Sequence, residues 1–516
     1  MARMVIFLFA IIFGICTAAP AEELVKTLPN LTEPLRSNHY TGYLPISDVK
    51  QLFYWFVESE SNPSTDPLVL WLNGGPGCAS MEGLFIEMGP FRVRNNGEKV
   101  ERNPWTWNRI ANIIYLDAPA GVGYSYYNTT TPVFTDDQVA QDNLAALKMW
   151  FTKFPDKKTN DFYIMGESYG GTYVPMISSL IAKNAADFPN FKGMLIGNGC
   201  VDDQINFNTN MLYQYFHGLF DETTFQTVLK TCCKGSLDCD FNAVLGLNNT
   251  CSDSVETLSE SVYYTGFDPY FLYYACYLNP NLPYPPNEEI QQLVLKNHLR
   301  RKMGLNTEKL VRGPVERIAG QPDCATHNDH IPYLNSKEVK QAIRIPSYVP
   351  DYQMCNYQIS ELYQSQYSTM TDFFNTVINA NKRIAMFNGD ADTLCNVVEN
   401  SQFIATRLKR AVKHTAHYWT DPVQKPRAVG LWTSYDGIDL VTIKGGGHFP
   451  AATEQKPKET YQMFQNFVRN QNYSTPVPFD TPYVPPTTTT IMTTTSISVN
   501  YQIFISMIVS FITFLL

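Results

Sequence analysis

The chain has few charged residues and only a small acidic excess. Asp, Glu, Lys and Arg make up 17% of its 516 residues, and the net charge of −9 comes from acidic residues spread along the sequence. Binding to nucleic acid requires a basic face or stripe. We therefore expect no nucleic-acid partner.

Metal-binding signatures are also missing. The sequence has only eight histidines and contains neither a His-x-x-Glu-His nor a Cys-x-x-Cys pattern. These are the spacings that place two ligands on one metal ion. We expect no metal and no organic cofactor.

Long hydrophobic runs are confined to the two ends of the chain. Residues 1–21 contain an apolar run from Met4 to Cys16 followed by small residues, which is typical of a secretory signal peptide cut between Ala18 and Ala21. The run is too short to span a membrane comfortably. The mature chain is therefore expected in the secretory pathway, with the lysosome and the cell exterior both open as destinations.

The C-terminal end combines a Thr-rich stalk (476–502) with an apolar tail (503–516). Fourteen helical residues would reach about 21 Å, which is less than the ~30 Å hydrocarbon core of a bilayer. The pattern is typical of a lipid-anchor signal that is removed during attachment. A short C-terminal membrane helix and a tail cleaved from a soluble enzyme are the alternatives.

Cysteines and glycosylation sites agree with a secreted chain. Of eleven cysteines, Cys16 leaves with the signal peptide, so ten remain, and disulfides are expected although the sequence alone does not pair them. Asn-x-Ser/Thr sequons predict glycosylation at four positions. These positions are Asn30, Asn128, Asn248 and Asn472.

Short apolar segments that end in glycine and polar residues recur in both halves of the chain. They lie at residues 66–77, 111–125, 161–171, 382–396 and 438–450. This pattern predicts a largely parallel α/β sheet, with ligands bound beyond the carboxyl ends of the strands. Residues 203–335 hold most of the cysteines and interrupt the pattern. We interpret them as an inserted cap between two parts of one core, 22–202 and 336–475.

One serine lies on a tight corner between a predicted strand and a predicted helix. Gly166-Glu167-Ser168-Tyr169-Gly170 fits the Gly-x-Ser-x-Gly nucleophile elbow, in which flanking glycines relieve crowding where strand and helix meet. The amide of Tyr169 can then face a developing oxyanion. A chance match to this short motif is the alternative interpretation.

A serine nucleophile needs a base, and in this architecture the acid and then the histidine follow the serine along the chain. His448 is the candidate base, because it lies on a glycine-rich loop directly after a late apolar strand. The acid is expected after the preceding strand, where the pattern does not choose between Asp390 and Asp392. The glycine loop at 73–78 is expected to supply the second oxyanion amide.

Together these stretches resemble the serine carboxypeptidase family, and the matching text runs in family order over residues 38–470. The stretches are "NHYTGYL", "WLNGGPGC", "NPWTWN", "LDAPAGVGYS", "GESYGGTYVP", "KGMLIGNG", "YLNSKEVKQAI", "NGDADTLCN" and "GGGH". The resemblance implies an α/β-hydrolase fold with a mixed, mostly parallel central sheet and a helical, disulfide-stapled cap. It also implies removal of single residues from peptide C-termini at acidic pH.

The resemblance also assigns roles to particular residues. It implies Ser168 as nucleophile, Asp392 as acid and His448 as base, with the amides of Gly75 and Tyr169 as the oxyanion hole. The group that binds the substrate's free carboxylate would be Asn73, Gly74, Glu87 and Glu167. The implied disulfides are Cys78–Cys355, Cys232–Cys251, Cys233–Cys239 and Cys276–Cys324, which leave Cys200 and Cys395 as free thiols.

Two adjacent carboxyl groups give a physical reason for the acid preference. If Glu87 and Glu167 share one site, they cannot both ionise cheaply, so the pair keeps a proton above the ordinary Glu pKa of about 4.3. The protonated pair can then donate a hydrogen bond to a substrate carboxylate. The alternative is that Glu167 simply packs at the elbow.

Several questions stay open at this point. Glu82 either favours basic leaving residues or is a solvated side chain. The text after His448 departs from the family pattern, which leaves the role of Phe449 as a pocket wall open. "LRRKMG" (299–304) is either a processing site or a solvated charge run. The acyl acceptor is either water or another nucleophile. A non-enzymatic alternative is that the protein only binds and stabilises other hydrolases. The protein is either a monomer or a homodimer.

Overall fold

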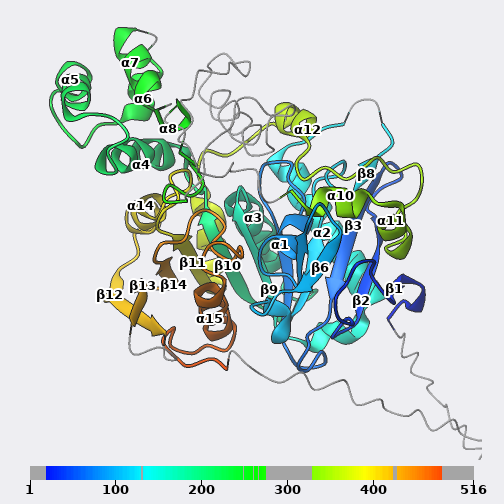
Figure 1. Cartoon of the computed structure of the whole chain (residues 1–516). Coiled ribbons are helices and arrows are strands. Elements are labelled where there is room, and N and C mark those ends of the chain that lie inside the picture. Colours follow the sequence, from blue (N-terminus) through cyan, green and yellow to red (C-terminus); the bar gives the residue numbers. More distant parts are fainter. Residues whose placement is uncertain are drawn as a thin grey trace, which may run out of the picture. The chain divides into compact units, whose positions relative to one another are not determined.

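The computed structural model describes residues 19–129, 132–247, 249–259, 261–264, 267–274, 328–421 and 427–478 (Figure 1). Several predictions fall outside these residues. They are most of the signal peptide, nearly all of the stalk, the tail, the sequon at Asn248, the Cys276–Cys324 bond and the basic segment 299–304.

One mixed sheet organises the described residues. Its strands, in chain order, are β1 (Leu24–Val25), β2 (His39–Pro45), β3 (Lys50–Val57), β4 (Leu68–Leu72), β7 (Asn112–Leu116), β8 (Tyr126–Tyr127), β9 (Phe162–Ser168), β10 (Phe191–Gly199), β11 (Arg383–Gly389), β12 (Val412–Asp421), β13 (Arg427–Tyr435) and β14 (Ile438–Ile443). A separate hairpin joins β5 (Phe91–Arg94) and β6 (Lys99–Arg102).

The strands follow the spatial order β1-β2-β3-β7-β4-β9-β10-β11-β14-β13-β12, with β8 paired to β3. The six strands from β7 to β14 are mutually parallel, and antiparallel strands extend both edges. The predicted fold class, a mixed sheet with a parallel centre, is confirmed. The edge strands do not follow from the apolar-run pattern.

Helices cover both faces of this sheet, which explains why its central strands are apolar throughout rather than alternating. Along β9, the Tyr163 ring contacts Phe467 of one helix, with ring centroids 5.7 Å apart. A Cβ built on Gly166 would point the other way and lie 2.9 Å from Val174 of another helix. Alternate strand residues point to opposite faces, so these two helices lie on opposite sides of β9.

The helices of the core are listed here with their bounds. They are α1 (Met81–Phe85), α2 (Asp136–Lys153), α3 (Gly170–Lys183), α10 (His330–Asn335), α11 (Lys337–Ala342), α12 (Tyr357–Leu362), α13 (Thr371–Asn379), α14 (Val397–Gln402) and α15 (Pro457–Val468). Short 3₁₀ turns occur at Ala21–Glu23, Trp107–Arg109 and Pro155–Thr159, and a π-helical turn at Phe403–Arg407.

Five further helices follow β10 and form an apolar cluster of their own. They are α4 (Asp203–Phe216), α5 (Glu222–Cys232), α6 (Phe241–Leu245), α7 (Thr250–Ser259) and α8 (Ser261–Tyr264). Figure 1 shows them gathered in green above α14. Met211, Phe225, Phe241 and Val255 are buried at the centre of this cluster, which is separate from the main core.

The described residues contain four disulfides, and one of them overturns a prediction. Cys78–Cys355, Cys232–Cys251 and Cys233–Cys239 are bonded in the structure. Cys200 and Cys395, expected as free thiols, form a fourth bond with their Cα atoms 5.0 Å apart. The reason is topological, because these residues follow the neighbouring parallel strands β10 and β11, whose carboxyl ends meet at one edge.

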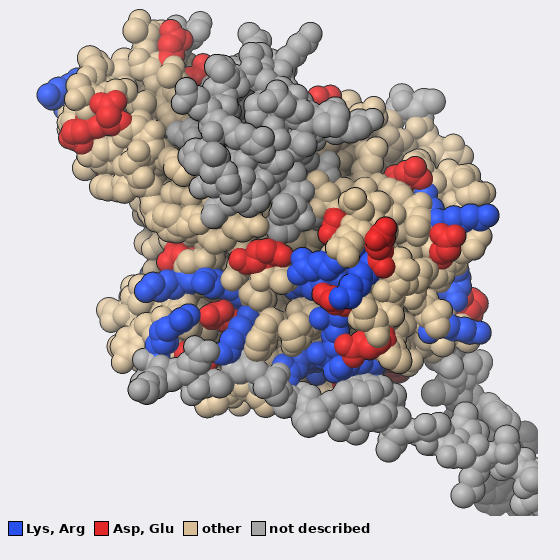
Figure 2. Space-filling model, in the orientation of Figure 1, with Lys and Arg blue, Asp and Glu red and all other residues tan. Residues whose placement is uncertain are grey.

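Surface features of the described residues bear on other predictions. Asn30, Asn128 and Asn472 are exposed, as a glycan acceptor must be. On the face shown in Figure 2, Lys and Arg are interspersed with Asp and Glu over the core. Among the described helices, none is both long enough and apolar enough to cross a membrane.

Candidate active site

Ser168 ends strand β9 with its backbone in the left-handed region. Its φ is 59°, which is uncommon for a residue with a side chain and costs backbone strain. Crowding explains the flanking glycines: a Cβ on Gly166 would lie 2.3 Å from the carbonyl oxygen of Leu72, and one on Gly170 would lie 3.0 Å from it. The chain therefore turns sharply into α3 and leaves the serine side chain at the corner.

The glycine loop after β4 passes directly over this corner. A Cβ on Gly74 would lie 2.5 Å from the backbone nitrogen of Tyr169 and 2.8 Å from Ser168 Cβ, so only glycine fits. Gly75 has a φ of 112°, again a conformation that favours glycine. The two segments that carry the predicted oxyanion amides, Gly75 and Tyr169, are thus in contact beside the serine.

His448 contacts Asp392 and not Asp390. The distance from His448 Nδ1 to Asp392 Oδ2 is 2.7 Å, and both side chains are fully buried. Asp390 instead accepts a hydrogen bond from the backbone of Gly445 at 2.6 Å. Among the described residues, His448 Nε2 has no hydrogen-bond partner, although it is buried. The imidazole is therefore oriented through one nitrogen and has the other available.

Three donors besides the histidine hold the Asp392 carboxylate. Asn198 Nδ2 and the backbone N–H of Cys395 donate to Oδ2 at 2.9 and 3.3 Å, and the N–H of Leu394 donates to Oδ1 at 2.9 Å. Together with the histidine, these donors hold the carboxylate in one orientation beside the imidazole.

Residues between β10 and β11 also brace the loop that carries Asp392. From α4, Asn206 donates to the carbonyl of Leu394 at 2.6 Å, and Tyr213 donates to the carbonyl of Asp390 at 2.5 Å. On the histidine side, the N–H of His448 donates to the carbonyl of Tyr270 at 2.6 Å. Helix α4 and Tyr270 therefore contribute to the geometry of the site.

A pair of buried carboxyl groups lies beside Ser168. The side-chain amide of Asn73 donates to Glu87 Oε1 at 3.1 Å and to Glu167 Oε1 at 2.7 Å. Burial and then the charge of Glu87 raise the pKa of Glu167 well above its ordinary value. Burial likewise raises the pKa of Glu87. One proton shared by the pair removes the repulsion between two anions.

Asn73 is itself oriented from the side opposite the carboxyl groups. Its Oδ1 accepts hydrogen bonds from Trp71 Nε1 at 2.7 Å and from the backbone N–H of Gly83 at 3.1 Å. With both lone pairs of Oδ1 engaged, the NH₂ group must face the two glutamates. The predicted carboxylate-binding residues Asn73, Glu87 and Glu167 thus form one hydrogen-bonded unit.

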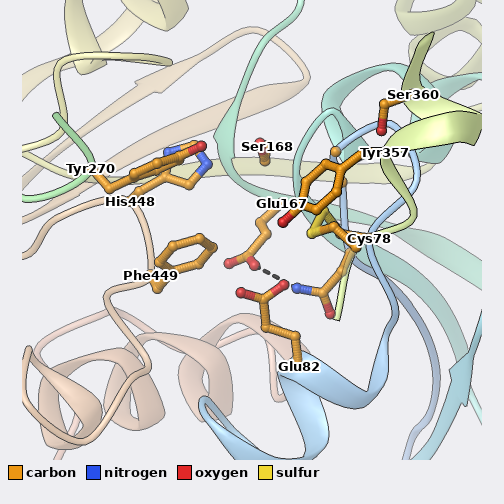
Figure 3. Close-up of a pocket in the computed structure, with 13 residues that line it drawn as sticks. Cys78, Glu82, Glu167, Ser168, Tyr270, Tyr357, Ser360, His448 and Phe449 are labelled. Carbon is orange, nitrogen blue, oxygen red and sulfur yellow. Dashed lines mark hydrogen bonds between the residues drawn. A yellow bond between two sulfur atoms is a disulfide. The ribbon is translucent and has the colours of Figure 1, made fainter. Parts of the chain in front are cut away.

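A pocket joins these groups, and Figure 3 shows the labelled side chains around it. Of the predicted catalytic, oxyanion and carboxylate-binding residues, six line it, namely Asn73, Gly74, Gly75, Glu167, Ser168 and His448, whereas Glu87, Tyr169 and Asp392 do not. Glu82 and Phe449, whose roles the sequence left open, line it too. Glu82 is only 5% exposed, so it is not a solvated side chain. Burial and then the charge of Glu87 raise the pKa of Glu82 well above its ordinary value.

Several residues of the site were not predicted. Tyr270, Tyr357 and Ser360 line the pocket, and Asn198 donates a hydrogen bond to Asp392. Asn198 carried a signal, because an asparagine within the apolar strand segment "MLIGNG" is buried at a cost unless it is hydrogen-bonded. Tyr270 and Tyr357 carried none, because only the fold brings their segments to the pocket.

Comparison with known proteins identifies relatives along most of the chain. The family model described as serine carboxypeptidase matches residues 29–470. A Caenorhabditis elegans protein, serine carboxypeptidase ctsa-4.1, is 36% identical over 480 residues, covering 92% of this chain and 98% of that relative. The mouse lysosomal protective protein is 32% identical over 465 residues, covering 88% and 95%.

A solved structure supports the same fold. The Saccharomyces cerevisiae carboxypeptidase Kex1, described as prohormone-processing, aligns with a TM-score of 0.66 at 18% identity. The alignment covers 87% of this chain and 96% of the yeast chain. At this identity the match shows the α/β-hydrolase fold alone.

Proposed function

The chain belongs to the serine carboxypeptidase family, and we propose that it releases C-terminal amino acids from peptides at acidic pH through Ser168, His448 and Asp392. The observation that carries the proposal is the buried unit of Asn73, Glu87 and Glu167 beside the serine. A protonated carboxyl pair and an amide can bind a peptide's free terminal carboxylate. An internal peptide bond offers no such group.

In this mechanism His448 takes the proton of Ser168 as the hydroxyl attacks the last peptide bond. Asp392 holds the imidazole in the required tautomer and stabilises the imidazolium, supported by the 2.7 Å contact with Nδ1. The amides of Gly75 and Tyr169 stabilise the oxyanion, and each such donor contributes on the order of 100- to 1,000-fold in turnover. His448 then protonates the leaving amine, and water releases the shortened peptide from the acyl-enzyme.

The acid preference follows from the carboxyl pair. Glu167 has a raised pKa because it is buried next to Glu87, so the pair keeps its proton at acidic pH. At higher pH the pair loses the proton, and two anions then repel the carboxylate of the substrate. Substrate binding therefore weakens as pH rises through the apparent pKa of the pair.

We also propose the secretory pathway as the location, with the lysosome or the cell exterior as destination. The described disulfides require an oxidising compartment for their formation, and the N-terminal apolar run supports the same route. The motifs resemble those of lysosomal cathepsin A within the family. The assignment of residues 203–335 as the cap is part of this proposal.

Two measurements on one preparation test the activity. A fluorophosphonate should label the parent at Ser168, and the parent should release the terminal amino acid from an N-blocked dipeptide between pH 4 and 6. Ser168→Ala should lose both, whereas the exposed Ser236→Ala control should keep both. Labelling without release of amino acid would contradict the carboxypeptidase assignment and favour an acyl donor other than a peptide, such as an ester. Release that persists in Ser168→Ala would contradict the nucleophile.

A further inference from the structure

We propose that the Cys200–Cys395 disulfide is a positioning crosslink of the catalytic centre, which holds the Asp392 loop in register with the backbone behind Ser168. The bond joins residues 195 positions apart in the sequence. The inference rests on the proposed function, because it concerns the alignment of the same serine, histidine and aspartate.

Cys200 lies directly against the nucleophile corner. Its backbone N–H donates to the carbonyl oxygen of Ser168 at 3.1 Å. A Cβ on Gly171, in the first turn of α3, would lie 2.6 Å from the carbonyl oxygen of Cys200 and 2.8 Å from its nitrogen. A displacement of Cys200 would therefore move the backbone on either side of the serine.

Cys395 lies at the other end of the bond, against the catalytic acid. Its N–H donates to Asp392 Oδ2, the same oxygen that contacts His448 Nδ1. Cys395 is fully buried, and its carbonyl accepts a hydrogen bond from Asn388 of β11 at 3.2 Å. One covalent bond thus connects the support of Ser168 with the support of the Asp392–His448 pair.

The position of the bond explains why a crosslink is useful there. The pairing of β10 with β11 runs from Gly193 and Arg383 to Gly197 and Phe387 and then stops. The backbone segments that contact Ser168 and Asp392, at Cys200 and Cys395, both lie beyond the last residue pair of this ladder. In this region the Asn198 side chain bonds to the N–H of Gly389 at 2.9 Å, and the disulfide supplies a covalent tie. The disulfide therefore joins the two segments just beyond the last hydrogen-bonded residue pair of β10 and β11.

The other disulfides make different connections. Cys232–Cys251 joins two residues 19 positions apart among the helices α5 to α7, away from the three residues of the proposed triad in the sequence. It therefore provides a matched control for removal of a crosslink. Cys78–Cys355 lines the pocket, so chemical reduction of the whole protein would not isolate the effect of the Cys200–Cys395 bond.

The first test is peptide mapping of the unreduced parent by mass spectrometry. It should yield a linked peptide that contains Cys200 and Cys395. Alkylation of both as free thiols in denatured, unreduced protein would overturn the proposal.

The second test is a double-mutant cycle of Cys200→Ala, Cys395→Ala and the double variant, assayed with the blocked dipeptide and by the rate of fluorophosphonate labelling. We expect kcat and the labelling rate to fall about 10- to 100-fold, because small misalignments of a triad have effects of this size. KM should change much less than kcat, because Asn73 and Glu87 lie on other elements and only Glu167 of the carboxylate-binding unit adjoins the displaced corner. Each single variant should show the full loss and the double variant no more, because either change breaks the same bond.

Control variants distinguish the loss of the crosslink from the loss of side-chain volume. Cys232→Ala/Cys251→Ala should keep the kcat of the parent, and Cys200→Val, which restores apolar volume without a crosslink, should behave like Cys200→Ala. Unchanged kcat, losses that add between the two sites, or failure of every Cys200 and Cys395 variant to fold would overturn the proposal. If the parent itself lacked labelling and release, the proposed function would fail instead.

Discussion

Glu87 and Glu167 accept hydrogen bonds from the same side-chain amide, at 3.1 and 2.7 Å, and each is only 1% exposed. Two carboxyl groups so placed share a proton rather than ionise together. In the proposed mechanism the pair acts as a hydrogen-bond donor in acid and as a double negative charge at higher pH. This relationship leads to the first prediction.

Replacement of both glutamates should remove the pH dependence of substrate binding. In the parent, KM for a blocked dipeptide should rise about tenfold per pH unit above the apparent pKa of the pair, because binding needs its proton. In Glu87→Gln/Glu167→Gln, KM should stay nearly constant from pH 4 to 8, because the amides cannot ionise. Glu338→Gln, on the exposed surface of α11, is the control. A double variant with the KM profile of the parent would contradict the mechanism.

The two aspartates after β11 should differ sharply. Asp392→Asn should lower kcat about 10⁴-fold, because an amide in place of the carboxylate favours the wrong tautomer of His448. Asp390→Asn should stay within a few-fold of the parent, since Asp390 accepts a bond from Gly445 rather than from the histidine. Steady-state kinetics on the two matched variants decide the assignment. Equal losses would mean that the 2.7 Å contact is not the functional one.

Glu82 should influence the choice of leaving residue in a pH-dependent way. Its raised pKa leaves it neutral in acid, whereas at higher pH it becomes a buried anion that pairs with a cationic side chain. We expect the ratio of kcat/KM for Lys-terminated over Leu-terminated dipeptides to rise as the pH is raised above the ordinary Glu range. Glu82→Gln should give a flat ratio. The ratio cancels the common effect of the carboxyl pair, and a parent ratio that does not change would contradict the role.

The stability of the fold should decrease between pH 7 and 8. Burial raises the pKa of Glu399 to about 8, so the folded protein keeps a proton that the unfolded chain has already released. The free energy of unfolding then falls by about 1 kcal/mol over this interval for one such group, because the folded protein has released half of this proton by pH 8. His39 does not oppose this, because burial lowers its pKa to about 3 and its effect lies below the ordinary histidine range.

Urea unfolding of the parent at pH 7 and pH 8 measures this slope. Glu399→Gln should show a smaller slope, because its side chain binds no proton in either state. A parent that becomes more stable over this interval would contradict the assignment of a raised pKa.

Much of the site was predictable because its residues belong to local patterns. The glycines around Ser168, the loop from Asn73 to Cys78 and the position of His448 each follow from short-range steric needs at the ends of apolar strands. Local patterns did not choose between Asp390 and Asp392, which are two residues apart on one turn. That choice depends on which side chain faces a histidine more than fifty residues away.

The pairing of the cysteines likewise depends on contacts between distant segments and not on local sequence patterns. Cys200 and Cys395 look unremarkable in the sequence, and the family resemblance left them unpaired. They are bonded because β10 and β11 are spatial neighbours, although α4 to α8 and further residues separate them along the chain. Glu82 is similar, since only the fold shows that it is buried against the pocket.

The sequence by itself determined the strand cores, the tight corner at Ser168 and the glycine loop above it, because these depend on sterics and burial within a few residues. The tertiary structure alone decided which aspartate contacts His448, which cysteines are bonded and which side chains are buried. Those properties depend on distances between segments that the order of strands in the sheet brings together.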